Sequence, residues 1–213
     1  MISEIIHLRT EYGKGGLSES DLHHDPIQQF RQWLNEALLA KLHEPYAMTL
    51  ATATSDGIPS ARIVLLRGID HQGFQFFTNY LSRKGTEIKK NARGALLFYW
   101  GELERQIRIE GTIIKSTEKD SDHYFAMRPR PSQLAAVASE QSEVIANRFM
   151  LEKRIEELAL QYEGRQVPRP AEWGGYLLQP TCLEFWQGRP SRLHDRLRYR
   201  QENDRWIIER LSP

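Results

Sequence analysis

The segment RPSRLHDR near the C-terminus combines residue types that bind anions. In an extended chain Arg192, His194 and Arg196 fall on one face, and Leu193 and Asp195 fall on the other. Two guanidinium groups beside an imidazole repel one another unless a ligand offsets the charge. An edge strand protected from aggregation by charge would explain the arginines but not the histidine. The pattern therefore favours a polar, anion-bearing ligand.

Three further pairs of basic residues could each hold a phosphate group: Arg62 with Arg67, Arg83 with Lys84, and Arg128 with Arg130. Arginine offers a planar fork for bidentate phosphate contacts. The first amides of a helix after Ser82 would add donors to a bound anion. A solvated charged face is the alternative for any one pair. The coincidence of three pairs favours anion binding.

Tyr124 and Arg128 lie four residues apart on a predicted helix, so both side chains project from the same face. Ser132 follows just beyond two prolines. Two hydroxyl groups and a guanidinium could converge on one anion. A core tyrosine with an arginine favoured by the helix dipole explains the same spacing.

Several classes of function lack support in the sequence. Neither HExxH, paired cysteines, GxSxG nor GxGxxG occurs, and the seven histidines show no metal-ligand spacing, so we expect no metal site. The net charge of +1 provides no overall field for nucleic acid or a membrane surface. With the single Cys182, no signal peptide and no membrane span, we expect a cytoplasmic protein.

The predicted helices and strands do not follow the alternating βαβ pattern of a parallel sheet. We predict a helix starting at Pro26 behind the N-cap Asp25, a short helix after Ser82, a helix from Thr117 to Met127 and a long helix from Ser142 to Tyr162. Strands are predicted at 47–54, 61–67, 74–79, 94–100, 106–113, 174–179, 182–187, 194–200 and 204–211. On one of these, Gln106, Arg108 and Glu110 share a face. The order predicts an α+β fold, mainly β, built on a small antiparallel barrel or sandwich.

The strings RIVLLR, FFTN, SRK, LERQ, HYFAMRPRPSQ, SEQS, EFWQG and RLHDR occur in the order and spacing typical of the pyridoxine 5′-phosphate oxidase family. The chain resembles that family from HLRTEYGKGGL to the C-terminus. The resemblance implies a split β-barrel that binds FMN, with peripheral helices, in a homodimer whose sites lie at the subunit interface. It divides the chain into a lid segment at 1–25, a split-barrel core at 26–165 and dimerisation and substrate-binding strands at 166–213.

The resemblance also implies a role for individual residues. FMN contacts fall on Arg62, Ile63, Val64, Leu65, Leu66, Arg67, Phe77, Thr78, Arg83, Lys84, Gln106, Gln141, Ser142, Trp186 and Arg196. Substrate contacts fall on Arg9, Tyr12, Arg67, Tyr124, Arg128, Ser132, Arg192 and His194, the last two also being the catalytic pair. The stretch from Arg9 to Tyr12 would close over the substrate.

Two positions depart from the family pattern. Lys often stands where this chain has Arg67, and Tyr commonly stands where it has Phe77. Arg67 keeps the charge but changes the geometry of a phosphate contact. Phe77 lacks a hydroxyl group, so any contact there must come from its backbone or ring.

The reaction implied by the resemblance is oxidation of pyridoxine or pyridoxamine 5′-phosphate to pyridoxal 5′-phosphate, in vitamin B6 biosynthesis and salvage. Hydride passes from substrate C4′ to the flavin, and O₂ takes the electrons and leaves as hydrogen peroxide, with ammonia released from the amine. The alternatives are another split-barrel flavin oxidoreductase and a non-catalytic protein that binds FMN or pyridoxal phosphate. Tyr124, Arg128 and Ser132 argue against the first, and the intact RLHDR argues against the second.

Overall fold

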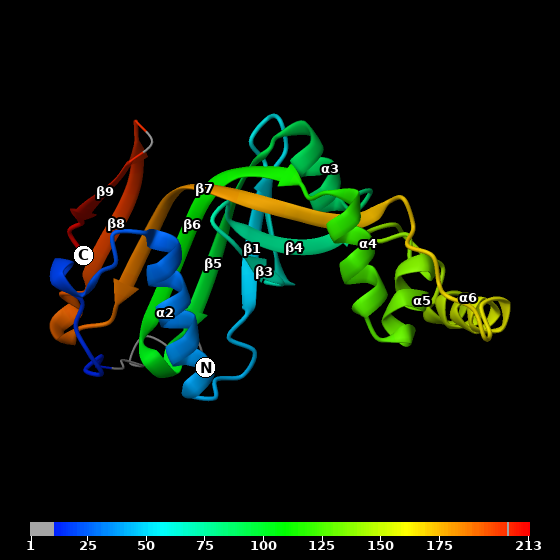
Figure 1. Ribbon diagram of the computed structural model, residues 1–213, viewed down its shortest axis with the longest axis horizontal. Helices are drawn as coiled ribbons and strands as arrows, with labels where there is room; N and C mark the ends of the chain where they lie inside the picture. The colour runs from blue at the N-terminus through cyan, green and yellow to red at the C-terminus, as the bar shows by residue number, and fades with distance from the viewer. Residues whose placement is uncertain (1–10, 204) are drawn as a thin grey trace, which may run out of the picture. The chain divides into compact units, whose positions relative to one another are not determined.

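The computed structural model describes residues 11–203 and 205–213, which form two compact units (Figure 1). The first unit contains residues 11–49, Ala95–Glu110 and Pro180–Pro213, and the second contains Leu50–Gly94 and Gly111–Gln179. The units interleave along the chain, whereas the division predicted at 25 and 165 is sequential. That division stays a prediction, and Arg9 lies outside the described residues.

A nine-stranded sheet runs through the part of the chain that the structure describes. Its strands are β1 (Ala47–Ala53), β2 (Pro59–Leu65), β3 (Gly68–Ile69), β4 (Phe74–Asn79), β5 (Arg93–Trp100), β6 (Arg105–Lys115), β7 (Trp173–Gln187), β8 (Asp195–Glu202) and β9 (Arg205–Arg210). The order is β2-β1-β5-β6-β7-β4-β3, and β8 pairs with β7 and β9. The pairs β3–β4, β4–β7, β7–β8 and β8–β9 are antiparallel. The predicted antiparallel α+β fold is confirmed.

Strand β7 corrects the prediction of two separate strands at 174–179 and 182–187. It continues through Pro180 as one element of 15 residues. Its pairing with β4 covers residues 173–178, and its pairing with β8 covers residues 182–187. Pro180 lies between the two ladders, so neither of them requires its missing N–H.

Local capping chemistry fixes the starts of three helices as predicted. The Asp25 side chain accepts a hydrogen bond from the Ile27 amide at α2 (Pro26–Leu39). Ser82 caps α3 (Arg83–Lys90), and Thr117 caps α4 (Glu118–Met127). Each cap satisfies an amide that the helix itself leaves without a partner.

The region after α4 departs from prediction. A helix, α5 (Arg130–Ala138), begins directly after the first proline, because Pro131 lies in its first turn, where a missing N–H costs nothing. The long helix predicted from Ser142 begins later, as α6 (Arg148–Gln161), because Asn147 caps it and Ser142 has a positive φ of 81°. Figure 1 shows α4, α5 and α6 following one another within the second unit.

Buried aromatic and aliphatic side chains hold these helices to the second unit. The cluster consists of Phe125, Leu134, Leu158, Val167 and Trp173, with Phe77 and Tyr124 packed against it. The predicted phosphate-binding helix is therefore anchored in a hydrophobic core. None of the described helices is long and apolar enough to cross a membrane. The cytoplasmic location stays a prediction.

Candidate functional site

The second unit holds a cavity of about 850 Å³ that gathers most of the contact residues predicted there. The predicted residues that line it are Arg62, Ile63, Val64, Leu65, Arg67, Phe77, Thr78, Lys84, Tyr124, Arg128, Ser132 and Gln141. They come from the edge strand β2, β4, the first turn of α3, α4, α5 and the loop after α5, with Arg67 in the turn after β2 and Arg128 just after α4. Met127, Pro129 and Trp173 line the same cavity without having been predicted.

The other predicted residues of this unit lie beside the cavity. Leu66 is buried in the core. The Arg83 amide donates to Ser142 Oγ over 3.1 Å, which ties the loop before α6 to the N-terminus of α3.

A group of cations surrounds the first turn of α3. The buried Lys84 Nζ donates to Thr78 Oγ1 over 3.2 Å and to Gln141 Oε1 over 3.0 Å. Arg62 Nη1 donates to Thr52 Oγ1 over 2.6 Å, and its Nη2 donates to Ser60. Burial and the charge of Arg62 lower the pKa of Lys84 to about 8. This end of the cavity is built to receive negative charge.

Aromatic rings form the cavity wall beside Arg128. The Phe77 and Tyr124 rings stack with centroids 4.0 Å apart. Trp173 continues the stack, with its centroid 5.6 Å from Phe77 and 6.1 Å from Tyr124. Phe77, one of the two positions that depart from the family pattern, thus contributes to the cavity wall through its ring. The stack fixes the position of the Tyr124 side chain within the cavity wall.

Arg128 is the one cavity cation with a buried donor left without a partner. Its guanidinium carbon lies 4.6 Å from the Trp173 ring centroid. Its Nη1 is buried and meets no hydrogen-bond acceptor within residues 11–203 and 205–213. Burial lowers the pKa of Arg128, Tyr124 opposes the shift and Arg67 adds to it. A buried unpaired donor costs about 1–3 kcal/mol, which a bound anion would recover.

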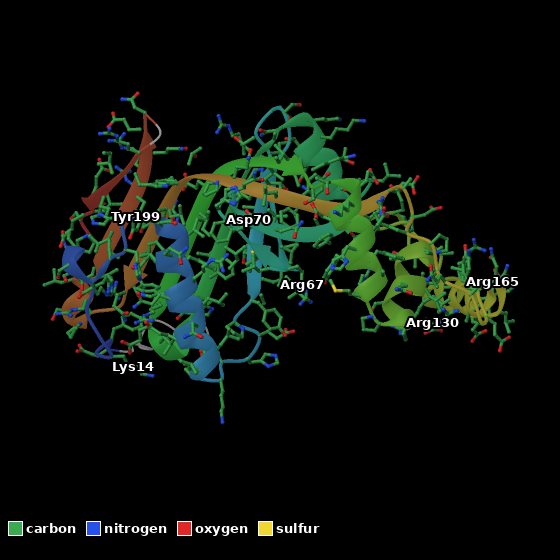
Figure 2. All side chains as sticks on the ribbon, viewed as in Figure 1. Lys14, Arg67, Asp70, Arg130, Arg165 and Tyr199 are labelled. Atoms are coloured by element: carbon green, nitrogen blue, oxygen red, sulfur yellow. The ribbon has the colours of Figure 1, made fainter. Side chains whose placement is uncertain are left out.

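Arg130, predicted as part of a phosphate pair with Arg128, points to other partners. Its guanidinium donates to the carbonyls of Arg165 over 2.9 Å and Tyr162 over 2.5 Å, at the end of α6. Figure 2 labels Arg130 and Arg165 among these helices. Arg130 holds two helix ends together and is not among the residues that line the cavity.

The first unit holds Tyr12, Gln106, Trp186, Arg192, His194 and Arg196. Within it, the Tyr12 ring meets Trp186 and His194 edge-on, at centroid distances of 5.6 and 5.5 Å. The Arg189 amide donates to His194 Nδ1 over 3.1 Å, so a neutral imidazole carries its proton on Nε2. A Cβ at Gly188 would lie 2.8 Å from Tyr12 Cγ, so only glycine admits this contact.

The extended face predicted for Arg192, His194 and Arg196 is wrong. Arg192 ends the 3₁₀ turn η3 (Pro190–Arg192) with φ of 62°, and β8 starts only at Asp195. The hydrogen bond between the Arg189 amide and the imidazole closes this turn. Arg196 instead donates to both carboxylate oxygens of buried Glu184, over 2.8 and 3.1 Å.

Sequence reasoning missed Glu87, which pairs with Arg62, as well as the lining residues Met127, Pro129 and Trp173. Glu87 faces Arg83 at the next turn of α3, an i,i+4 spacing that could have revealed it. Trp173 opens β7 after a Pro-rich segment, and no signal in the sequence links it to Arg128.

The fold and the cavity define the class: an α+β protein built on a mainly antiparallel sheet, with a cation-lined cavity beside an edge strand and a helix N-terminus. The family models for pyridoxamine 5′-phosphate oxidase and for the C-terminal dimerisation region of pyridoxine 5′-phosphate oxidase match residues 34–162 and 173–213. The chain therefore belongs to the pyridoxamine 5′-phosphate oxidase family, which is an enzyme family.

Individual relatives agree with this assignment. The pyridoxine/pyridoxamine 5′-phosphate oxidase of Rubrobacter xylanophilus is 57% identical, over 99% of this chain and 97% of its own length. That of Cupriavidus pinatubonensis is 56% identical over the full length of both chains.

Two solved structures share the fold. PhzG from Burkholderia lata, in complex with tetrahydrophenazine-1-carboxylic acid, is 35% identical with a TM-score of 0.89, covering 94% of this chain and 100% of that one. A pyridoxamine 5′-phosphate oxidase-related, FMN-binding protein from Nostoc punctiforme has a TM-score of 0.68 at 18% identity, covering 86% and 97% of the two chains. The expected split barrel is thereby confirmed.

Proposed function

We propose that this protein oxidises pyridoxine or pyridoxamine 5′-phosphate to pyridoxal 5′-phosphate, with FMN as cofactor and O₂ as electron acceptor. The alcohol and O₂ yield the aldehyde and hydrogen peroxide, and the amine consumes one water in addition and releases ammonia. The observation that carries the proposal is one cavity with two cationic ends, at Lys84 and at Arg128. Such a cavity suits a phosphorylated cofactor together with a phosphorylated substrate.

The donor set at the first end fits the phosphate monoester of FMN. Lys84, Arg62 and the hydroxyl of Thr78 line the cavity, and α3 starts beside them, so the positive end of its helix dipole lies there. The edge strand β2 brings the backbone of Ile63, Val64 and Leu65 to the cavity, where its polar groups suit a planar heterocycle. When bound, the flavin supplies the redox chemistry, taking a hydride from the substrate and passing electrons to O₂.

The second end suits the phosphate of the substrate. Arg128 offers its buried Nη1, and Tyr124 and Ser132 offer hydroxyl groups to the same cavity. An anion there would pair the Arg128 donor, which has no partner among the described residues. Arg67 lines the cavity too and adds positive charge near Arg128.

Arg192 and His194 would orient the ring of the substrate. Arg192 is exposed, and its guanidinium offers hydrogen-bond donors and no acceptor, so its role would be to orient the substrate and stabilise charge. His194 has Nδ1 occupied by the Arg189 amide, so its Nε2–H is the donor available to an acceptor atom of the substrate. Both residues work by positioning, which supplies much of the catalysis when a cofactor carries the chemistry.

We further propose a homodimer in which each site receives residues from both subunits. The match to a dimerisation region at residues 173–213 supports it, since this region includes Trp186, Arg192, His194 and Arg196. The predicted lid at Arg9 to Tyr12 belongs to this proposal. Arg9 lies outside the described residues, and the ring of Tyr12 contacts His194 and Trp186, which supports a contact between Tyr12 and a substrate held by His194.

An assay of peroxide and aldehyde release tests the proposal. The FMN-loaded protein should turn over pyridoxine and pyridoxamine 5′-phosphates, and unphosphorylated pyridoxine should react poorly at equal concentration because it leaves Arg128 unpaired. Absence of both products from an FMN-loaded dimer would favour a carrier without turnover.

A second candidate is oxidation of a reduced phenazine precursor, favoured by the likeness to PhzG in its complex with tetrahydrophenazine-1-carboxylic acid. The buried donor of Arg128 with two neighbouring hydroxyl groups favours a phosphate over a flat tricyclic acid. Parallel assays with tetrahydrophenazine-1-carboxylic acid and pyridoxine 5′-phosphate separate the two candidates.

A further inference from the structure

Glu87 is a buried carboxylate at the centre of the cations around α3, and neither the proposed reaction nor the predicted contacts use it. Its Oε2 accepts hydrogen bonds from Thr52 Oγ1 and Ser60 Oγ, both over 2.5 Å, and lies 3.4 Å from Arg62 Nη2. Its Oε1 accepts from Arg83 Nε over 2.9 Å. One side chain therefore holds four donors from β1, β2 and α3.

The same contacts lock Arg62. Its Nη1 donates to the Leu50 carbonyl over 3.1 Å and to Thr52, and its Nη2 donates to Ser60 and faces Glu87. Because Thr52 and Ser60 each touch both the carboxylate and the guanidinium, the position of Arg62 depends on Glu87 through three routes. A guanidinium held this firmly loses little freedom when an anion binds nearby.

The charges around Glu87 do not cancel. Arg62, Arg83 and Lys84 contribute three positive charges, and Glu87 contributes one negative charge. Burial opposes ionisation of Glu87, but the hydrogen bonds of Ser60, Thr52 and Arg83 outweigh it and lower the pKa to about 2. The carboxylate is thus ionised at neutral pH, and about two positive charges remain, which match a phosphate monoester dianion.

We propose that Glu87 is a positioning residue for the phosphate of the flavin: it orders Arg62 and Arg83 and limits their repulsion with Lys84, and so makes the site select FMN over riboflavin. This inference rests on the proposed function. Two effects of Glu87 on a bound phosphate oppose each other. Its charge repels the dianion, whereas its hydrogen bonds fix the cations, and the inference is that ordering outweighs repulsion.

The test compares Glu87→Gln with wild type in the full-length apoprotein, titrated with FMN and with riboflavin by flavin fluorescence. The glutamine side chain keeps the shape of Glu87, but it loses the negative charge and places an NH₂ group where a carboxylate oxygen accepted hydrogen bonds. FMN should bind about 10-fold to 100-fold more weakly, the effect of losing one charge-assisted hydrogen bond. Riboflavin, which has no phosphate, should bind within about 2-fold of wild type, because its contacts do not involve this cluster.

Glu152→Gln is the matched control, because Glu152 makes an exposed i,i+4 ion pair with Arg148 in the same unit. Glu152→Gln should change neither the affinity for FMN nor the affinity for riboflavin. Should Glu87→Gln fail to fold, Thr52→Val removes one shared hydroxyl group from Glu87 and Arg62 and should weaken FMN alone in the same way.

The outcomes separate the two proposals. FMN binding by Glu87→Gln that equals or exceeds that of wild type means that repulsion dominates, and overturns the inference. An equal loss of FMN and riboflavin affinity assigns Glu87 to folding alone and also overturns it. Wild type that binds no FMN refutes the proposed function itself.

Discussion

Replacing Arg128 by methionine should weaken catalysis without a matching loss of stability. Arg128 Nη1 is buried without a partner in the part of the chain that the structure describes, while the guanidinium packs on Trp173. Methionine keeps an unbranched stem of similar length and removes the charge. Substrate binding and folding therefore respond in different ways to the same change.

The magnitudes follow from the contacts. A charge-assisted hydrogen bond to the substrate phosphate contributes about 1.5–3 kcal/mol, so kcat/KM should fall by about 10-fold to 100-fold. For folding, removing an unpaired buried donor recovers about 1–3 kcal/mol, and losing the contact with Trp173 costs about 0.5–2 kcal/mol. The unfolding free energy should therefore lie no more than about 1 kcal/mol below that of wild type, equivalent to about 2–4 °C in Tm.

The assay pairs peroxide release from pyridoxine 5′-phosphate with thermal unfolding of the apoprotein. Arg130→Met is the control, since Arg130 donates only to the carbonyls of Tyr162 and Arg165 among the described residues. It should leave kcat/KM unchanged. A loss of more than about 2 kcal/mol in Arg128→Met with unchanged kcat/KM would refute the reasoning, because it would make Arg128 a structural cation.

Three further predictions concern the same cavity. Lys84 has a pKa of about 8, so FMN affinity should fall about 10-fold per pH unit above that value, because the free protein loses the proton of Lys84. Lys84→Arg should abolish this fall. An FMN affinity of wild type that does not change with pH in this range would contradict a contact between Lys84 and the phosphate. Arg169 donates to Asp122 and to the Trp173 carbonyl, over 2.6 Å each, and so holds α4 in place. Arg169→Gln should therefore lower the free energy of unfolding, measured in urea, by about 1–3 kcal/mol and raise KM. Unchanged values of both quantities would exclude this role. Trp173→Leu removes the aromatic face beneath Arg128 and should raise KM about 2-fold to 30-fold, with FMN affinity retained. An equal weakening of substrate and FMN binding would indicate general unfolding of the cavity.

Local chemistry made much of the fold predictable. Asp25, Ser82 and Thr117 cap helices because a side-chain oxygen reaches an amide within three residues, whatever the rest of the chain does. Likewise Arg108 and Glu110 share a face of β6, as alternation predicts, and form an ion pair at 2.7 Å.

The failures arise from contacts that strand periodicity and helix signals do not encode. The turn at Arg192 depends on an imidazole five residues from the amide it binds, so strand periodicity could not reveal it. Pro129 follows the end of α4 and is the N-cap of α5, and a proline is an equally good signal for the end of one helix and the start of the next. The cavity assembles residues from Arg62 to Trp173, and the resemblance to the family supplied most of them. The spacing from Arg83 could have pointed to Glu87, but its contacts with Thr52, Ser60 and Arg62 required coordinates.

An anaerobic titration tests the central claim most directly. FMN-loaded protein is mixed with pyridoxine 5′-phosphate in the absence of O₂, and the visible absorption of the flavin is followed. We predict bleaching in proportion to added substrate, with recovery of absorption and release of peroxide on admission of air, and much slower bleaching by unphosphorylated pyridoxine at the same concentration. Flavin that stays oxidised with pyridoxine 5′-phosphate would contradict the claim that this cavity oxidises a phosphorylated B6 vitamer.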